Sequence, residues 1–544
     1  MQTAQALTST KPKKSRYDAI VVGGGHNGLV CAAYLAKAGH DVLVLERRHV
    51  LGGAAVTEEI YPGFKYSVCS YVVSLFRPHI IRELELARHG MELIPLEASF
   101  LPLPDGDSLC RWSDPHRTRR EVERFSKRDA ETLPEFGLAM SQLARFAKRV
   151  IDQPAPDPTS LDPRELWKLL RLGRDMQGLD ADLQYLNFKL MTMSAVDFLQ
   201  QWFESETLLA PMSVSGIIGT MLGVRSPGSA YVLLHHYMGE IDGAFRSWGF
   251  SKGGTGQVSL ACASAAREFG AEIVTEAPVA RVVIDGQRAK GVVLENGDEI
   301  SAKVVVSGLD PRRTFMQLVG SDHLDAEFVE SIGHYKYRGS SGKVNLALDG
   351  LPEFTCRPGD GAHLRGDIAI APNLDYLERA YDEAKYGDFS SEPYMNIVIP
   401  SLVDPSVAPP GKHVMSIFVQ YAPYKIKEGP EYWPQRREAF GDAVIKTLAQ
   451  YCPTLPDRIL HRQVLTPWDL EQEFGLTEGN IFHGELSLSQ LFFLRPVPGW
   501  AQYRTPLRGL YMCASGTHPG GGVMGAPGRL AARVILQDVE AGNA

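Results

Sequence analysis

The stretch Tyr17–Glu46, YDAIVVGGGHNGLVCAAYLAKAGHDVLVLE, decides the fold. It begins with a short apolar run that is bounded by glycine, which is typical of a buried parallel strand. Three glycines follow in the spacing G-x-G-x-x-G, at Gly23, Gly25 and Gly28. A run that favours a helix comes next, and then a second apolar run that ends in an acid. This order predicts the start of a Rossmann-like dinucleotide-binding domain.

Each part of this pattern suits a bound dinucleotide. Gly23 permits a tight turn, Gly25 lets the backbone approach a pyrophosphate, and Gly28 lets helix and strand pack closely. The N-terminus of the helix supplies free N–H donors and partial positive charge. Glu46 stands at the end of the second strand. A carboxylate at that place can accept hydrogen bonds from the ribose hydroxyls of an adenosine.

The residues after Glu46 favour FAD over a nicotinamide cofactor. Arg47 opens a short loop that leads to the glycine pair Gly52-Gly53 and to Ala54. A second glycine pair gives the backbone another place to approach a phosphate or a ribityl chain. A nicotinamide domain normally continues directly into its next βα unit, whereas here the pattern breaks into a long excursion. We therefore expect tightly bound FAD, with an ordinary loop at Gly52-Gly53 as the alternative.

The Rossmann-like pattern resumes in two later parts of the chain. The elements expected to complete it are a helix at 258–269, strands at 272–275, 279–284, 291–294 and 303–306, and a last core strand at 509–515. Strands at 344–348 and 414–419 are expected outside this domain. The predicted fold class is therefore α/β, a discontinuous Rossmann-like FAD-binding domain with an inserted α+β substrate domain that contains an antiparallel sheet.

This division sets the expected domain boundaries. The FAD-binding domain is predicted from segments 17–110, 245–335 and 500–540, and the substrate domain from segments 111–244 and 336–499. Residues 1–16 are polar and lysine-bearing and are expected to form a disordered tail. FAD would lie between the two domains, because open α/β sheets bind ligands at the carboxyl ends of their strands.

The bulk composition excludes several classes of function. The net charge of −8 over 544 residues gives no general attraction to nucleic acid, so no nucleic-acid partner is expected. The seven cysteines include no C-x-x-C, which excludes the dithiol of disulfide reductases and fits a reducing compartment. No metal-ligand spacing appears among the 15 histidines, so no metal site is expected. With no secretory signal and no run of about 18 apolar residues, we expect a cytoplasmic protein, with membrane association or a mitochondrial matrix location as alternatives.

A glycine-rich run, Gly516–Gly528, precedes a sequence that otherwise favours a helix. Glycine costs roughly 0.5–1 kcal/mol relative to alanine inside a helix, so this run needs a reason. The strand at 509–515 would deliver it to the same face as the dinucleotide loop. Bare N–H groups and a helix N-terminus there would stabilise the N1–C2=O edge of a reduced flavin.

Three stretches together resemble the phytoene-desaturase-like flavoproteins, which include carotenoid desaturases, prolycopene isomerases and retinol saturases. They are residues 23–55, 248–261 and 509–535. Residues 480–490 and 493–498 are similar in particular to a branch with the desaturase-like β-carotene ketolases and pyridine nucleotide-disulphide oxidoreductase domain-containing protein 2. The resemblance extends over nearly the whole chain.

The resemblance implies bound FAD, a tunnel for an apolar substrate, and access to a membrane. The expected FAD contacts are Gly23, Gly25, His26, Asn27, Gly28, Glu46, Arg47, Gly52, Gly53, Ala54, Val279, Ser307, Gly516, Gly521, Gly522, Val523 and Met524. Many desaturases and amine oxidases carry an arginine where this chain has Ala54. That arginine helps to hold the flavin, so its absence makes amine-oxidase chemistry less secure.

Few side chains are candidates for catalysis, because hydride transfer to flavin N5 needs geometry and a dry pocket more than a strong base. His518 lies inside the glycine-rich run and is a candidate donor, or else a residue that fixes the loop. His236 is a candidate pocket residue, or else a satisfied core histidine. Glu485 and Arg495 are candidates to line the site. The apolar, glycine-interrupted segment 208–224 could touch a bilayer surface, or else form a core helix.

These observations predict an FAD-dependent oxidoreductase that acts on a carotenoid-like, polyene-like or other extended apolar molecule. The expected electron acceptor is O2, a quinone or another oxidant. One alternative is a flavin amine or alcohol oxidase. A second alternative is a flavin-binding interaction or regulatory protein with little turnover, since a fold alone does not determine function.

Overall fold

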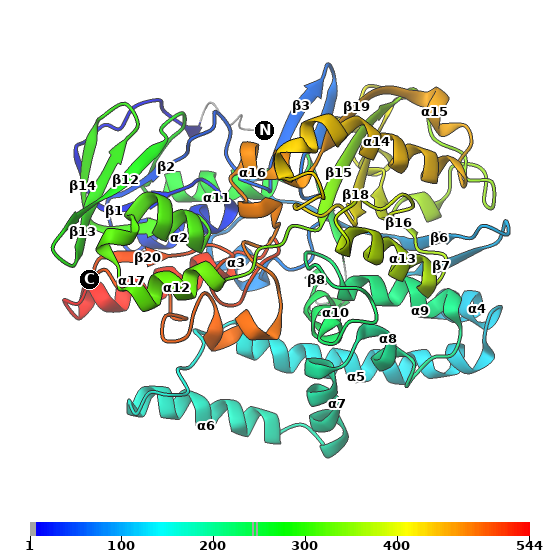
Figure 1. Cartoon of the computed structure of the whole chain (residues 1–544), viewed down its shortest axis with the longest axis horizontal. Helices are drawn as coiled ribbons and strands as arrows, with labels where there is room; N and C mark the ends of the chain where they lie inside the picture. Colours follow the sequence, from blue (N-terminus) through cyan, green and yellow to red (C-terminus); the bar gives the residue numbers. More distant parts are fainter. Residues whose placement is uncertain (1–6, 242–243, 246–247) are drawn as a thin grey trace.

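The structure, a computed structural model, describes residues 7–241, 244–245 and 248–544. Two seven-stranded sheets dominate it. They lie on opposite sides of the molecule in Figure 1, and a group of helices covers the lower side. Among the described residues, no helix has both the length and the apolar character that crossing a membrane requires.

The first sheet contains the dinucleotide-binding sequence and has the strand order β11-β2-β1-β14-β13-β12, with β20 paired to β14. Its strands are β1 (Arg16–Val22), β2 (Val42–Leu45), β11 (Glu272–Val274), β12 (Val279–Asp285), β13 (Arg288–Leu294), β14 (Glu299–Ser307) and β20 (Leu510–Met512). β1 pairs in parallel with β2 and β14, whereas β12, β13 and β14 form an antiparallel meander. Three separate parts of the chain thus build one sheet, as the sequence predicts.

Three helices pack around this sheet: α2 (His26–Lys37), α11 (Gly256–Glu268) and α17 (Ala526–Glu540). The buried residues of α2 include the small side chains of Gly28, Cys31, Ala32, Ala33 and Ala36, and both α11 and α17 pack against this helix. A Cβ on Gly528 would lie 2.1 Å from the Asn27 carbonyl oxygen. Close packing of α17 on α2 therefore explains the last glycine of the glycine-rich run.

The second sheet has the order β19-β15-β18-β17-β16-β6-β7. Its strands are β6 (Ala98–Pro102), β7 (Ser108–Trp112), β15 (Ser341–Leu348), β16 (Asp367–Ile370), β17 (Tyr394–Val398), β18 (His413–Gln420) and β19 (Ile459–Leu465). The predicted domain boundary at residue 110 lies too late in the chain. β6 pairs in parallel with β16, and β7 pairs with β6. Residues 98–112 therefore belong to the second sheet.

A group of helices forms most of the lower side in Figure 1. They are α4 (Pro115–Glu123), α5 (Lys127–Ile151), α6 (Pro163–Gln177), α7 (Ala181–Thr192), α8 (Ala195–Leu199), α9 (Glu206–Ser213) and α10 (Ser229–Tyr237). The segment 208–224 lies within this group and contributes Leu208, Leu209 and Met212 to a large apolar core. The suggestion that it touches a membrane is wrong, because these side chains are buried inside the protein.

The remaining elements connect these layers. They are α3 (Pro78–Glu83), α12 (Ala326–His334), α13 (Leu374–Lys385), α14 (Trp433–Ala449), α15 (Leu455–Arg458), α16 (Pro467–Phe474), β3 (Thr57–Tyr61), β4 (Phe64–Ser67), β5 (Leu93–Pro95), β8 (Glu240–Ile241), β9 (Ala244–Phe245) and β10 (Gly249–Ser251).

The segment before β1 is ordered from residue 7, whereas the sequence predicts a disordered tail. Ser9 donates its N–H to the Ile273 carbonyl and accepts from the Thr275 N–H, both at 3.0 Å. Leu7 is buried. The prediction is wrong for residues 7–16 because β11 is the edge strand, and its free backbone groups bind this segment. Residues 1–6 of the predicted tail lie outside the described residues.

Candidate cofactor and substrate site

One cavity of about 440 Å³ is lined by residues of both sheets. Its size is in the range of small-molecule and cofactor sites. Thirteen of the predicted FAD contacts line it: Gly23, Gly25, His26, Asn27, Gly28, Glu46, Arg47, Gly52, Gly53, Ala54, Val279, Gly522 and Val523. The fold thus brings together three parts of the chain that the sequence singled out.

The glycine loop forms a cradle at the N-terminus of α2. Gly23 has a φ of +101°, and a Cβ on Gly28 would lie 2.4 Å from the Gly23 carbonyl oxygen, so both positions need glycine. A Cβ on Gly25 would instead meet nothing within 4 Å, because this residue faces the cavity. No side chain of the described residues caps the N-terminus of α2. Its N–H groups are therefore available to a phosphate, and this cradle fits the pyrophosphate of a dinucleotide.

Glu46 organises the loop from the end of β2. Its carboxylate accepts hydrogen bonds from the backbone N–H groups of Gly24, at 2.8 Å, and Arg48, at 2.9 Å. Gly52 in turn donates its N–H to the Gly24 carbonyl at 2.9 Å, which places the second glycine pair beside the first. The two glycine loops and Glu46 therefore form one unit, in the arrangement that an adenosine diphosphate group needs.

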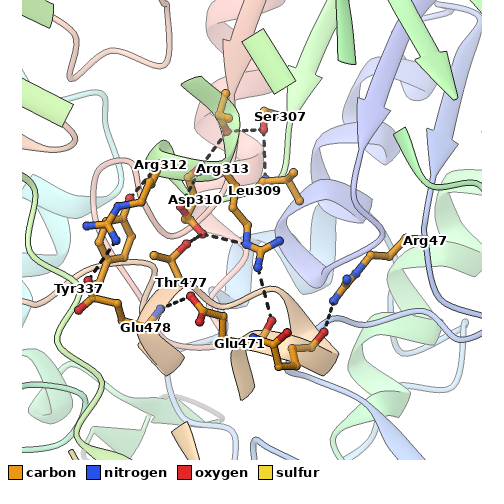
Figure 2. A network of polar contacts seen from close by, with 12 residues as sticks. Arg47, Ser307, Leu309, Asp310, Arg312, Arg313, Tyr337, Glu471, Thr477 and Glu478 are labelled. Atoms are coloured by element: carbon orange, nitrogen blue, oxygen red, sulfur yellow. Dashed lines mark hydrogen bonds and ion pairs between the residues drawn. The ribbon is translucent and has the colours of Figure 1, made fainter. Parts of the chain in front are cut away.

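Two arginines close this end of the cavity against α16 (Figure 2). Arg47 donates to the Glu473 carbonyl at 2.6 Å, and Arg313 donates to the Glu471 carbonyl at 3.5 Å. These carbonyls lie at the C-terminal end of α16, where the helix dipole favours a positive charge. Arg313 was missed in the sequence because it follows β14 and reaches the cavity only through the fold.

The other end of the cavity holds a buried lysine. Lys343 of β15 is 2% exposed, and its Nζ has no hydrogen-bond partner among the described residues. The ammonium lies 4.4 Å from the centre of the Tyr71 ring, which stacks on Phe418. Burial lowers the pKa of Lys343 to about 7. The sequence signal for it was a lysine directly before an apolar strand.

Acidic side chains are confined to the dinucleotide end. Among the described residues that line the cavity, the carboxylates are Glu46 and Glu295. The charge of each acts to raise the pKa of Arg47, so both lie near that arginine. The Tyr71 ring and the Cys69 thiol lie next to Lys343, and Phe418 is its pairing partner on β18. Ile218, Trp248 and Phe482 are further apolar residues of the described lining. This end is therefore apolar with a single titratable cation.

Three histidines also reach the cavity. His26 begins α2, its Nε2 is buried without a hydrogen-bond partner in the described part of the chain, and burial together with nearby His483 lowers its pKa to about 4. His236, a predicted candidate, donates its Nδ1–H to the Val232 carbonyl at 2.9 Å, and burial lowers its pKa to about 4. Both rings are therefore neutral at pH 7. His483 was missed as a site residue, although the stretch 480–490 that contains it carries part of the family resemblance.

Five predicted residues are absent from the described lining of the cavity: Ser307, Gly516, His518, Gly521 and Met524. The Ser307 hydroxyl bonds to the Thr314 hydroxyl at 2.7 Å. A Cβ on Gly516 would lie 2.5 Å from Pro311. These two positions therefore serve packing around β14.

The remaining three are held by neighbours. The ring of Phe482 covers Gly521, and the Met524 side chain packs in a small apolar cluster. His518 lies 3.3 Å, Nε2 to oxygen, from the Val150 carbonyl of α5. Its place away from the cavity makes it a residue that fixes the loop.

Glu485 and Arg495 are also absent from the described lining. The Glu485 carboxylate pairs with Arg338. The fully buried Arg495 guanidinium donates to five backbone carbonyls, those of Phe482, Gly484, Glu485, Gln490 and Ser515. Arg495 thus ties the loop that carries Phe482 and His483 to the end of β20.

The sequence matches the flavin containing amine oxidoreductase family over residues 28–536. The chain belongs to this family. Pyridine nucleotide-disulfide oxidoreductase domain-containing protein 2 of Rattus norvegicus is 41% identical over 97% of the chain and 94% of its own length. A limonene dehydrogenase subunit of Castellaniella defragrans is 26% identical, over 96% and 95%. The lycopene-forming phytoene desaturase of a Paracoccus species is 25% identical, over 96% and 97%.

A solved structure agrees in fold. An oxidoreductase from Methanosarcina mazei superposes with a TM-score of 0.60 at 17% identity, covering 96% of this chain and all of that one. The family match and the sequence relatives confirm the resemblance to desaturase-like flavoproteins. The protein is an FAD-dependent oxidoreductase of this family, and the cradle around Gly25 fits that cofactor.

Proposed function

We propose that the protein oxidises a neutral, extended apolar molecule by removing a hydride and a proton from it. FAD, when bound, supplies the hydride acceptor. The observation that carries this proposal is the contrast between the two ends of the cavity. Carboxylates and arginines gather at the dinucleotide end, and apolar side chains surround one lysine at the other. We propose O2 or a quinone as the final electron acceptor.

The apolar end would bind and orient the substrate and exclude water. Tyr71 and Phe418 form a stacked wall, with ring centres 5.8 Å apart. His236 and Phe482 form another aromatic contact, with ring centres 6.3 Å apart. Flat aromatic surfaces suit a polyene, because they offer a large contact area without polar groups that would need partners.

Lys343 is the residue that would move the proton. Formation of a carbon–carbon double bond releases one hydride and one proton from neighbouring carbons. With a pKa of about 7, the Lys343 Nζ is partly unprotonated at neutral pH and can accept that proton. Because no described residue forms a hydrogen bond with this nitrogen, its lone pair is available.

The same residue disfavours the amine-oxidase alternative. An amine substrate is a cation at neutral pH and is normally held by a carboxylate or by electron-rich groups. Here the carboxylates Glu46 and Glu295 lie beside Arg47, and the apolar end carries a group that is itself partly positive. The names of two relatives, the limonene dehydrogenase subunit and the phytoene desaturase, also refer to hydrocarbons.

Anaerobic stopped-flow reduction of the FAD-loaded protein tests this proposal. Terpene and polyene hydrocarbons would be compared with diamines and primary alcohols by the loss of oxidised flavin absorbance. We expect reduction by hydrocarbons alone, with a rate that rises with pH through about 7 because Lys343 must be unprotonated. The Lys343→Met variant should lose this pH dependence, and the matched Lys290→Met variant, at an exposed position, should keep it. Fast reduction by a diamine but by none of the hydrocarbons would overturn the proposal.

A further inference from the structure

Helix α6 presents apolar side chains to solvent. It runs along the lower edge of the molecule in Figure 1, away from both sheets, and none of its residues is buried. Leu166 is 42% exposed, Trp167 60% and Leu170 73%. Their spacing places all three on one side of the helix. A surface helix of a soluble domain normally turns such a stripe inward.

The acidic residues of α6 lie on its inner side instead. Glu165 accepts hydrogen bonds from the Gln502 side chain at 2.9 Å and from the Asp157 N–H at 3.0 Å. Asp175 pairs with Arg149 of α5 at 3.2 Å. These contacts fix the rotation of the helix, so the outward direction of the apolar stripe is set by polar anchors.

The exposed face of α6 also carries only positive charge. Its exposed residues are Pro163, Arg164, Leu166, Trp167, Leu170, Arg171, Gly173, Arg174 and Gln177. The structure describes every residue of this face, and it holds three arginines and no carboxylate. The whole chain, in contrast, has a net charge of −8. The Arg171 guanidinium lies 5.6 Å from the centre of the Trp167 ring. This combination is typical of helices that lie in the interface of an anionic membrane.

The neighbouring segments extend the apolar surface. Leu161, just before α6, is 86% exposed. On α7, which follows after a short turn, Tyr185 is 69% exposed and Phe188 62%. Lys189 is exposed beside Phe188. Aromatic rings with a nearby cation favour the headgroup region of a bilayer.

We propose that the outward face of α6, extended by α7, docks the protein on an anionic phospholipid membrane. The arginine rim would contact lipid headgroups, and Leu166, Trp167 and Leu170 would enter the boundary with the acyl chains. Lipid is the proposed occupant because the arginines of this face complement anionic headgroups, while the exposed leucine and tryptophan side chains between them suit the boundary with the acyl chains. Docking of this kind does not depend on the reaction in the cavity.

Vesicle co-sedimentation of the full-length, FAD-loaded protein tests the docking surface. Vesicles of phosphatidylcholine alone would be compared with vesicles that also contain phosphatidylglycerol. The variant W167S/L170S should bind the anionic vesicles roughly tenfold or more weakly, because each side chain loses apolar burial. The variant R171Q/R174Q should lose roughly fivefold per arginine on anionic vesicles only. Tyr386→Ser removes another exposed aromatic, 71% exposed at the end of α13, and should change nothing.

Flavin absorbance and circular dichroism would show that each variant is folded. Absence of binding to either kind of vesicle, or binding that W167S/L170S leaves unchanged, would overturn the proposal. A dimer that forms without vesicles and is lost in W167S/L170S, together with no vesicle binding, would instead show that this face joins two copies of the chain.

Discussion

Replacing Lys343 by methionine should stabilise the protein below neutral pH. In the folded protein burial lowers the pKa of this lysine from 10.5 to about 7. Each tenfold change in proton affinity corresponds to about 1.4 kcal/mol. The buried charge therefore costs on the order of 5 kcal/mol at pH 6. A methionine of similar length should recover most of this cost.

The gain should depend on pH in a definite direction. Because the folded pKa of Lys343 lies below the unfolded one, the unfolded chain holds more protons between about pH 7 and pH 10.5. The stability of the parent protein therefore rises across this window, whereas the variant has no lysine at position 343 and lacks this rise. The difference in unfolding free energy should narrow by roughly 2–3 kcal/mol between pH 6 and pH 9.

Urea unfolding of both proteins at several pH values, followed by circular dichroism, measures this difference. Lys290→Met is the matched control, since Lys290 is half exposed on β13 and should give no pH-dependent change. A Lys343→Met protein that is less stable at every pH would refute the reasoning. So would a difference that stays constant from pH 6 to pH 9, because Lys343 would then have an ordinary pKa.

The remaining predictions concern the cofactor and the loops around it. Gly25→Ala should weaken FAD binding at least tenfold in a calorimetric titration without unfolding the protein, whereas Gly137→Ala, also free of close neighbours, should leave binding unchanged. Arg495→Met should lower the unfolding free energy by roughly 3–5 kcal/mol, measured by chemical denaturation, because five carbonyls lose a charged donor. His518→Ala should reduce thermal stability but leave flavin reduction within about twofold, whereas His236→Ala should slow reduction, since His236 belongs to the described lining of the cavity and His518 does not.

The first sheet could be predicted because its signal is local. The strand, glycine loop, helix and terminal acid of residues 17–46 follow one another directly, and each glycine has a steric reason that spacing reveals. The later strands could be found for the same reason, since their apolar runs are short and bounded by turn residues. The contact of the predicted residues with FAD stays a prediction.

The second sheet and the apolar end of the cavity depend on pairings between distant parts of the chain. Nothing near residues 98–112 indicates that β6 pairs with β16, more than 250 residues later. Lys343 and His483 likewise enter the cavity only through the fold. Lys343 stands directly before an apolar run, and His483 lies in the stretch 480–490, but neither pattern indicates a place in the cavity. Their burial and their missing hydrogen bonds appear only in the folded protein.

The glycine-rich run shows how a correct location can have a different cause. Gly522 and Val523 line the cavity, as the sequence predicts. Gly516 and Gly528 are instead required by Pro311 and by the backbone of α2. A glycine that permits close contact with a cofactor and one that permits close packing of two helices leave the same mark in the sequence.

The most direct test of the central claim is an anaerobic flavin spectrum of the purified protein during titration with a lipid extract from its source. Bleaching of the oxidised flavin band by the apolar fraction of the extract, and not by its amine fraction, is the predicted result. Bound flavin that dithionite reduces but no apolar fraction bleaches would contradict the proposed oxidation. A protein that binds no flavin at all would contradict the assignment of the cavity itself.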